Sequence, residues 1–316
     1  MKKTLKIATR KSQLALWQAN WIKSQLEERN PGMNVELVRI LTKGDKILDV
    51  PLSQVGGKGL FVKEIEDALL DGRADIAVHS MKDVPTELPP GLHLAVITER
   101  ADPRDAWFSK DGVGFQDLPE GALVGTSSLR RQTQLKALRP DLRFEHLRGN
   151  VDTRLRKLEE GLYDAIVLAA AGVKRLGLAD KVTEYLADDV VLPATGQGAV
   201  GIECRVQDAE TNALIAPLNH RASWLAVTAE RAFLATLEGG CQVPIAGYAQ
   251  LDGDTLKMRG LVGSLDGETL IRGSREGGAN DAQMIGQALG EEILDRGGRE
   301  ILEEVYRLET LSPLKP

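Results

Sequence analysis

The chain has 316 residues, enough for two or three domains, and its 42% hydrophobic and 27% charged residues are typical of a globular protein. A net charge of −6 and an aromatic content of 4% argue against a nucleic-acid-binding protein, which would usually be basic and would stack bases on aromatic rings. The two cysteines are too few for a disulfide framework, and the four histidines lack metal-ligand spacing, so we expect no metal site.

Short apolar runs alternate with helical periodicity over the N-terminal third. The pattern predicts strands at 5–9, 35–41, 75–79 and 92–98, and helices at 12–28 and 60–70. Strands that alternate with helices imply parallel strands joined by crossover helices, and hence an α/β domain. The basic start has no apolar core of signal-peptide length, and no run approaches the ~18 apolar residues of a membrane helix, so we expect a cytoplasmic protein.

A polar stretch at 98–104 breaks this pattern and is the expected linker to a second α/β domain. The alternation then restarts, with strands at 122–125, 142–147 and 164–169 and helices at 128–138, 153–160 and 170–176. A second break lies at 192–198, and a strand follows at 200–205. The sequence does not show which sheet this last strand joins.

The C-terminal part has a different pattern. A long helix at 223–237 precedes three strand-like segments near 245–249, 255–262 and 269–273, and helices follow at 281–295 and 300–308. Because these strands are grouped apart from the helices, we expect a small α+β domain with an antiparallel sheet.

Cationic and hydroxyl side chains follow two of the first predicted strands. In an open α/β sheet, ligands bind beyond the carboxyl ends of the strands, where helix N-termini offer free N–H groups. Arg10 and Ser12 follow the first strand, and Ser80, Lys82 and Asp83 follow the third. The carboxylate of Asp83 is either one half of a local ion pair or a group that shuttles a proton or stabilises positive charge on a substrate.

The second predicted domain repeats this arrangement. Its strand-to-helix turns carry Thr126, Ser127, Ser128, Arg130, Arg131, Arg148, Gly149 and Arg154. Cations in the first helical turn are unfavourable by roughly 0.3–1 kcal/mol each, so arginines at these positions need an explanation. Arginines that simply line a solvated helix face would explain one such turn. Several cationic turns in two similar domains instead favour an anionic ligand.

The anion that these residues favour is a polycarboxylate. Arginine donates two parallel hydrogen bonds to a carboxylate or a phosphate. The stretch Gly56-Gly57-Lys58-Gly59 lacks the spacing and the Ser or Thr after lysine that a phosphate-binding loop needs, which disfavours a nucleotide. Dispersed arginines fit several carboxylates better than one compact phosphate.

Cys241 lies on a short loop after the long helix, between Gly239-Gly240 and Pro244. The glycines end the helix and leave little side-chain bulk next to the thiol, so a large molecule could approach it. From this loop alone, Cys241 is either a small buried hydrophobic residue or an attachment point or nucleophile. Cys204 lies in an apolar strand and is expected to pack in the core.

Six segments, taken together, resemble the porphobilinogen deaminase, or hydroxymethylbilane synthase, family. They occur in family order and are ATRKS (8–12), HSMKDVP (79–85), GTSSLRR (125–131), LRGNV (147–151), LPATGQGA (192–199) and GGCQVP (239–244). The resemblance implies three domains, which are residues 1–98 with 199–216, residues 104–192, and residues 221–316. The first two are similar to the α/β lobes of solute-binding proteins and flank a cleft, and the strand at 200–205 returns to the first. The third, a small α+β domain with an antiparallel sheet, presents Cys241 to the cleft.

The resemblance also implies the reaction. In this family the cysteine carries a dipyrromethane cofactor through a thioether, and this cofactor is a primer of two substrate units that stays on the enzyme. The enzyme is a transferase that condenses four porphobilinogen molecules to the linear tetrapyrrole hydroxymethylbilane, with loss of ammonia at each step, in porphyrin and heme biosynthesis. Loss of ammonia leaves an electrophilic azafulvene, and Asp83 would hydrogen-bond the pyrrole N–H groups and stabilise the positive charge.

Roles for the other site residues follow from the same resemblance. Asp83 is the expected catalytic residue. The expected cofactor-binding residues are Ser80, Lys82, Asp83, Thr126, Ser127, Ser128, Arg130, Arg131, Arg148, Gly149 and Cys241. The expected substrate-binding residues are Arg10, Ser12, Lys58, Arg154, Arg175 and Gln197. The cations match the acetate and propionate groups of each pyrrole, and we expect a monomer that binds no nucleic acid and no membrane.

Two other classes of protein remain to be distinguished. A non-enzymatic two-lobed anion-binding protein would share the cationic cleft, but it would give Cys241 no role and would usually carry an export signal. A nucleic-acid-binding protein would need a basic face, stacking aromatic rings and strong salt dependence. Replacing Asp83 by Asn separates these classes, because only the enzyme would lose turnover while it keeps its bound primer.

Overall fold

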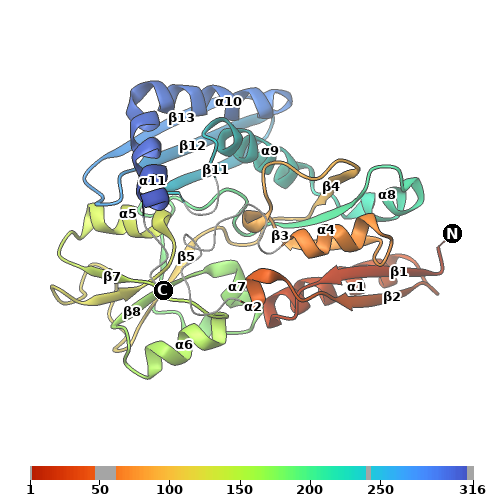
Figure 1. Cartoon of the computed structure of the whole chain (residues 1–316), viewed down its shortest axis with the longest axis horizontal. Helices are drawn as coiled ribbons and strands as arrows, with labels where there is room; N and C mark the ends of the chain where they lie inside the picture. The colour runs from red at the N-terminus through yellow and green to blue at the C-terminus, as the bar shows by residue number, and fades with distance from the viewer. Residues whose placement is uncertain (1, 47–61, 240–242, 312–316) are drawn as a thin grey trace. The chain divides into compact units, whose positions relative to one another are not determined.

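The computed structural model describes residues 2–46, 62–239 and 243–311 (Figure 1). The described chain forms two compact units. Unit 1 comprises residues 2–46, 62–101 and 198–224, and unit 2 comprises residues 102–197, 225–239 and 243–311. Two of the boundaries, after residues 101 and 197, fall inside the polar breaks that the sequence indicates at 98–104 and 192–198.

Unit 1 is built on a five-stranded sheet with the strand order β2-β1-β3-β10-β4. β10 runs antiparallel to both of its neighbours, whereas β1 is parallel to β2 and to β3. The strands are β1 (Thr4–Thr9), β2 (Asn34–Arg39), β3 (Ile76–Ser80), β4 (Leu92–Ile97) and β10 (Val200–Arg205). The pairing of β10 with β3 and β4 confirms that the strand after the second break returns to the N-terminal sheet, as the family resemblance implied.

Helices cover both faces of the unit 1 sheet. Ile22 of α1 packs in one core cluster with Ile7 of β1, and Ile65 of α4 packs in a second cluster with Ala8 of the same strand. Successive side chains of a strand point to opposite faces, so one strand contributes to both clusters. The helices and short helical turns are α1 (Gln13–Arg29), α2 (Lys43–Lys46), α4 (Lys63–Leu70), η1 (Met81–Asp83), α8 (Ala209–Ile215) and η3 (Ala216–Leu218).

Unit 2 contains a second five-stranded sheet, with the order β7-β6-β8-β5-β9. β6 is parallel to β7 and β8, and β5 is antiparallel to β8 and β9. The strands are β5 (Asp105–Ser109), β6 (Leu123–Gly125), β7 (Arg143–Glu145), β8 (Ala165–Ala169) and β9 (Glu184–Leu186). The helices are α5 (Leu129–Leu138), α6 (Val151–Glu159), α7 (Ala170–Arg175) and the turn η2 (Ala179–Lys181).

The C-terminal part of unit 2 holds a three-stranded antiparallel meander with the order β11-β12-β13. Its strands are β11 (Ile245–Asp252), β12 (Thr255–Gly263) and β13 (Leu270–Gly278). Its helical elements are α9 (Arg221–Thr236), which begins in unit 1, and η4 (Ala279–Asp281), α10 (Ala282–Ile293), the π-helical segment η5 (Leu294–Gly298) and α11 (Arg299–Leu311). The mixed α/β class, with two α/β sheets and a C-terminal antiparallel sheet, is therefore as predicted.

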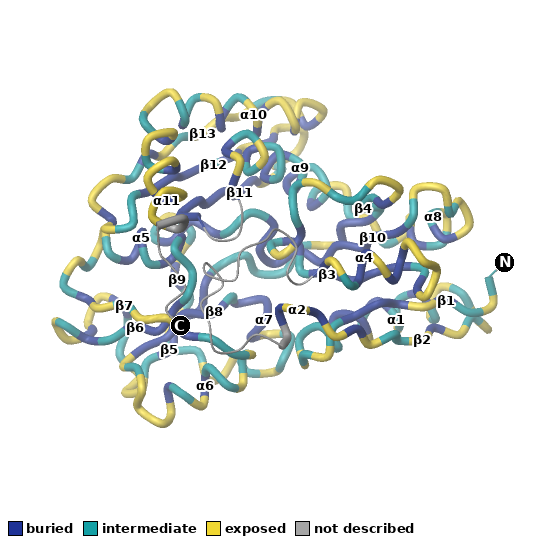
Figure 2. Tube along the Cα trace, viewed as in Figure 1, coloured by how far each residue is buried: buried dark blue, intermediate teal, exposed yellow. Residues whose placement is uncertain are grey.

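Phe233 of α9 lies at the centre of the C-terminal core and is fully buried. A Cβ atom at Gly260 of β12 would lie 2.6 Å from the Phe233 ring, which is closer than any real contact. Glycine at this position therefore lets the helix pack directly on the sheet. Figure 2 shows burial along the chain, with buried residues following the strands and the inner faces of the helices.

Two features relevant to function are absent from the described part of the chain. Among residues 2–46, 62–239 and 243–311, no helix is long and apolar enough to cross a membrane. The same residues contain no group of three or more His, Cys, Asp or Glu side chains placed to hold a metal ion.

Candidate active site

The carboxyl ends of β1 and β3 bring several predicted site residues together in unit 1. These strands are parallel neighbours, so the turns that follow them lie at one edge of the sheet. A hollow of about 60 Å³ at this edge is lined by residues of both turns, including Arg10, Ser12, Ser80 and Asp83. We call it the unit 1 hollow. Four residues that the sequence indicated separately therefore share one small site.

Local structure explains how these side chains are presented. Ser12 is the N-cap of α1, and its Oγ accepts a hydrogen bond of 3.3 Å from the Ala15 N–H. Ser80 ends β3, and the short turn η1 carries Lys82, which is half-buried, and Asp83, which is exposed. The carboxylate of Asp83 is therefore accessible to a ligand.

Two residues of the unit 1 hollow were missed by the sequence analysis. Gln18 and His79 are buried, with 3% and 6% of their surface exposed, and both line the hollow. The Nε2 of Gln18 has no hydrogen-bond partner among the described residues. A signal was present for each, because Gln18 lies on the helix that Ser12 caps and His79 directly precedes Ser80.

In unit 2, Arg130 and Arg131 form a buried ion cluster with Asp105. The Nε and Nη2 atoms of Arg131 donate to Asp105 Oδ1 at 3.0 and 2.7 Å, and Arg130 Nη1 lies 2.8 Å from Oδ2. Arg130 also donates to the Leu192 carbonyl at 2.8 Å, and Arg131 to the Val167 carbonyl at 3.0 Å. The fork of each guanidinium is thus held in one orientation by the protein.

The electrostatics of this cluster favour the charged state. Asp105 is fully buried, and the side chains of Arg130 and Arg131 are 5% and 6% exposed. Burial alone would raise the pKa of Asp105, but the two guanidinium groups outweigh it and hold that pKa below its usual value. Burial lowers the pKa of Arg130. The sequence analysis missed Asp105, because it follows the predicted linker and no neighbouring motif marks it.

Gln197 extends the cluster, whereas Arg175 lies apart from it at the end of α7. Gln197 Nε2 donates to Asp105 Oδ1 at 3.0 Å and to the Pro103 carbonyl at 2.6 Å. The Oε1 atom of Gln197 is buried and has no hydrogen-bond partner among the described residues. Burial lowers the pKa of Arg175 to about 10.

Predicted residues also lie on the turns after β6 and β7, which are parallel neighbours, and Arg154 lies on α6. Ser127 Oγ donates to the Leu147 carbonyl at 2.8 Å, and Thr126 Oγ1 accepts from the Ser128 N–H at 3.2 Å. The two turns are therefore tied together by side-chain hydrogen bonds.

The turn after β7 has a strained backbone position. Gly149 has φ 115°, and a Cβ there would lie 2.7 Å from Thr153 Cγ2, so only glycine fits. Arg154 Nε donates to the Gly149 carbonyl at 2.8 Å, and Arg148 is half-buried on the same turn. Two further predicted residues, Lys58 and Cys241, lie outside the described residues.

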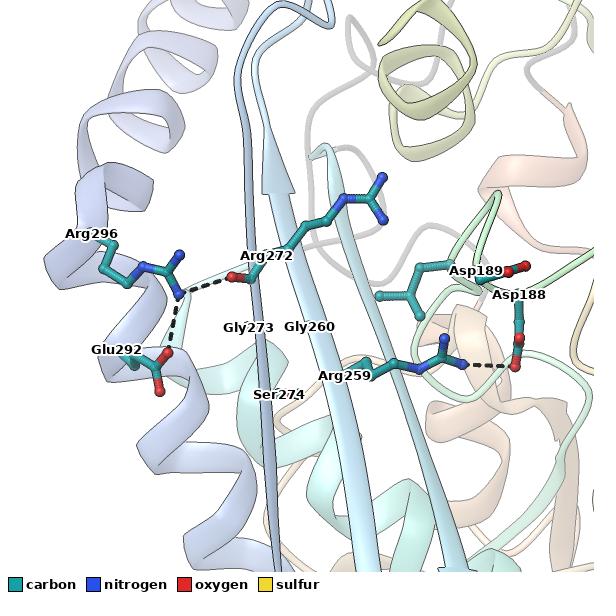
Figure 3. Close-up of a pocket in the computed structure, with 10 residues that line it drawn as sticks. Asp188, Asp189, Arg259, Gly260, Arg272, Gly273, Ser274, Glu292 and Arg296 are labelled. Atoms are coloured by element: carbon teal, nitrogen blue, oxygen red, sulfur yellow. Dashed lines mark hydrogen bonds and ion pairs between the residues drawn. The ribbon is translucent and has the colours of Figure 1, made fainter. Parts of the chain in front are cut away.

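A larger hollow of about 470 Å³ lies elsewhere in unit 2, beside β12 and β13 (Figure 3). Three of its lining residues are arginines, but two of these pair with carboxylates. Arg259 lies 2.8 Å from Asp188, and Arg296 lies 3.1 Å from Glu292 (Figure 3). None of the predicted site residues that the structure describes lines this hollow.

Comparison with known proteins identifies the family. Residues 5–213 match the family model described as "Porphobilinogen deaminase, dipyromethane cofactor binding domain", and residues 224–295 match "Porphobilinogen deaminase, C-terminal domain". The porphobilinogen deaminase of Geotalea uraniireducens is 60% identical over 97% of this chain and 96% of its own length, and that of Geobacter sulfurreducens is 60% identical over 96% of both chains. Among solved structures, the periplasmic aliphatic sulphonate binding protein SsuA from Escherichia coli is 18% identical, with a TM-score of 0.42 over 75% of this chain and 71% of that chain. The sequence matches over nearly the whole length show that this chain belongs to the porphobilinogen deaminase family.

Proposed function

We propose that this chain is a transferase that condenses four porphobilinogen molecules to hydroxymethylbilane, releasing one ammonia at each step, in tetrapyrrole biosynthesis. The observation that carries the proposal is the unit 1 hollow, where an exposed carboxylate and a guanidinium share one small site. This set suits a substrate with both pyrrole N–H donors and carboxylate groups. The family membership supports the same reaction.

Asp83 is the proposed catalytic residue. Its carboxylate accepts a hydrogen bond from the pyrrole N–H of the bound substrate and stabilises the positive charge that develops on the ring as ammonia leaves. Arg10 and Ser12 bind the acidic side chains of the substrate, together with Lys58, Arg154, Arg175 and Gln197. An ion pair between a guanidinium and a carboxylate fixes orientation as well as charge, because the bond is bidentate.

The donor groups of unit 2 fit the carboxylates of a dipyrromethane cofactor. Arg130 and Arg131 are held rigidly by Asp105, and each guanidinium has five N–H donors, more than the protein contacts use. The turns after β6 and β7 add hydroxyl and amide donors from Thr126, Ser127, Ser128, Arg148 and Gly149. Ser80, Lys82 and Asp83 are the proposed cofactor contacts of unit 1. When bound, the dipyrromethane supplies the nucleophilic pyrrole carbon from which the chain grows.

Cys241 is the proposed covalent anchor of the cofactor, through a thioether. It lies in the segment that matches the C-terminal family domain and outside the described residues. We further propose three domains, with residues 1–98 and 199–216 in the first, 104–192 in the second and 221–316 in the third. We propose a cytoplasmic monomer that binds neither nucleic acid nor membrane.

Turnover of porphobilinogen tests this function directly. The purified protein is incubated with porphobilinogen, and ammonia and tetrapyrrole are quantified together. The proposal predicts four ammonia molecules for each tetrapyrrole. Substrate that binds without release of ammonia would instead indicate a two-lobed binding protein.

A further inference from the structure

The turn that carries Asp83 is held by β10. The Met81 N–H donates to the Ala199 carbonyl at 3.1 Å, which links the turn to the residue that precedes β10. Gly201 of β10 lies directly opposite His79 in the ladder, and any Cβ at Gly201 would collide with Met81 Sδ. The turn therefore rests on β10 through both its backbone and the Met81 side chain.

A second link joins the same two strands just before the turn. His79 Nε2 lies 2.8 Å from Glu203 Oε2, and the two side chains are 5% and 0% exposed. Glu203 lies opposite Ala77, which is two positions from His79. His79 and Glu203 are therefore diagonal neighbours on one face of the sheet. Because His79 directly precedes Ser80 and lines the unit 1 hollow, this contact fixes the start of the turn.

The surroundings of this pair are acidic as well as buried. Glu66 of α4 is 7% exposed, and its burial, reinforced by the charge of Glu203, raises its pKa to about 7 despite the opposing effect of His79. The Oε1 atom of Glu203 has no hydrogen-bond partner among the described residues. Other charged groups near this site include the exposed Asp67 on α4, and Arg10 and Asp83, which line the unit 1 hollow with His79.

We propose that His79 and Glu203 are positioning residues that hold the Asp83 turn in place, and that Glu66 makes this hold depend on pH. The expected effect on turnover rests on the proposed function, whereas the expected effect on amide exchange does not. When Glu66 loses its proton, a second negative charge lies beside Glu203 in a buried site. The two carboxylates then repel each other, and the hold of Glu203 on the turn weakens.

Hydrogen exchange and kinetics of Glu203→Gln test the positioning. We expect amide exchange in a peptide spanning residues 78–85 to become about 10-fold faster, the effect of losing one hydrogen bond to a charged group. We expect kcat to fall by about the same factor while KM changes less than about 3-fold, because the turn carries Asp83 and none of the proposed substrate-binding cations. Glu36→Gln, which changes an exposed carboxylate on β2 of the same sheet, is the matched control and should change neither quantity.

Glu66→Gln tests the pH dependence and does not require activity. After correction for intrinsic rates, exchange in residues 78–85 should rise between pH 6 and pH 8 in the parent protein and stay flat in Glu66→Gln. Equal pH dependence in both proteins would overturn the proposal, as would unchanged exchange in Glu203→Gln. If Glu203→Gln does not fold, the Glu66→Gln comparison alone decides. A parent protein that releases no ammonia would contradict the proposed function and leave this exchange result intact.

Discussion

The sheets of units 1 and 2 share one plan but neutralise a buried charge in different ways. Each has three parallel strands, then one antiparallel strand, then an edge strand, in the orders β2-β1-β3-β10-β4 and β7-β6-β8-β5-β9. In both sheets the antiparallel strand carries a carboxylate that is 0% exposed, Glu203 on β10 and Asp105 on β5. The common plan places a buried acid next to the third parallel strand in each unit.

The two buried acids have different partners and different surroundings. Asp105 is paired with Arg130 and Arg131, which stay charged at all physiological pH values. Glu203 is paired with His79 and lies near Glu66, a buried carboxyl whose pKa is raised to about 7 by its burial. We conclude that permanent cations neutralise the buried acid of unit 2, whereas the buried acid of unit 1 lies near a carboxyl group whose charge responds to pH.

Breaking the permanent cluster should have the largest effect. We expect Asp105→Asn to lower the free energy of unfolding by about 3–5 kcal/mol, because it leaves two buried guanidinium groups without a counter-charge. Denaturant unfolding measures this change. Asp188→Asn, which removes the partly exposed partner of Arg259, is the control and should cost no more than about 1 kcal/mol. Equal losses for the two variants would show that the buried cluster is not a special stabilising feature.

Removing the exposed carboxylate of unit 1 should affect chemistry rather than stability. We expect Asp83→Asn to reduce kcat at least about 100-fold, because the amide cannot stabilise the positive charge of the substrate ring. The denaturation midpoint should stay unchanged, since Asp83 is exposed. Glu87→Gln, a nearby exposed carboxylate, should retain full turnover. Normal turnover in Asp83→Asn would exclude Asp83 as the catalytic residue.

The smallest expected effect is a pH dependence of thermal stability that arises from unit 1. The pKa of Glu66 is raised from 4.5 to about 7 in the folded protein, so its protonated form is favoured there. A stability penalty is therefore absent below pH 4.5, grows between pH 4.5 and 7, and is complete above pH 7. Compared with the parent protein, Glu66→Gln should gain thermal stability as pH rises through this window, and Glu36→Gln should not. A difference in Tm between the parent protein and Glu66→Gln that stays constant as pH changes would contradict the raised pKa.

Most of the fold could be predicted from the sequence, because the apolar periodicity of long segments such as α1 and α9 identifies them as helices. The strands β5 and β9 were missed, since β5 directly follows a polar stretch and β9 spans only Glu184–Leu186. Periodicity needs more residues than such short strands provide. The partner strands of β10 also could not be derived from local pattern, because strand pairing is a long-range contact, and the family resemblance indicated only that this strand returns to the first domain.

The candidate site was predictable where residues lie in a recognisable turn, and not where contacts join distant segments. The turns with Arg10 and Asp83 are contiguous motifs, and the structure places them at one hollow. Asp105 follows a polar stretch, Glu203 lies in an apolar strand, and Glu66 lies between Glu64 and Asp67, so no local pattern marks any of the three as a site residue. Nothing in the sequence near Glu203 indicates that His79, 124 positions earlier in the chain, is its partner.

The central claim is that this chain builds a tetrapyrrole on a primer attached to Cys241, and the mass of the denatured protein tests it most directly. The protein is produced in a host that makes porphobilinogen, and the Cys241 peptide is mapped alongside a Cys241→Ser variant. The account predicts an excess mass of one two-pyrrole unit on the Cys241 peptide and none in the variant. A bare Cys241, even after incubation with porphobilinogen, would contradict the covalent primer and favour a two-lobed anion-binding protein.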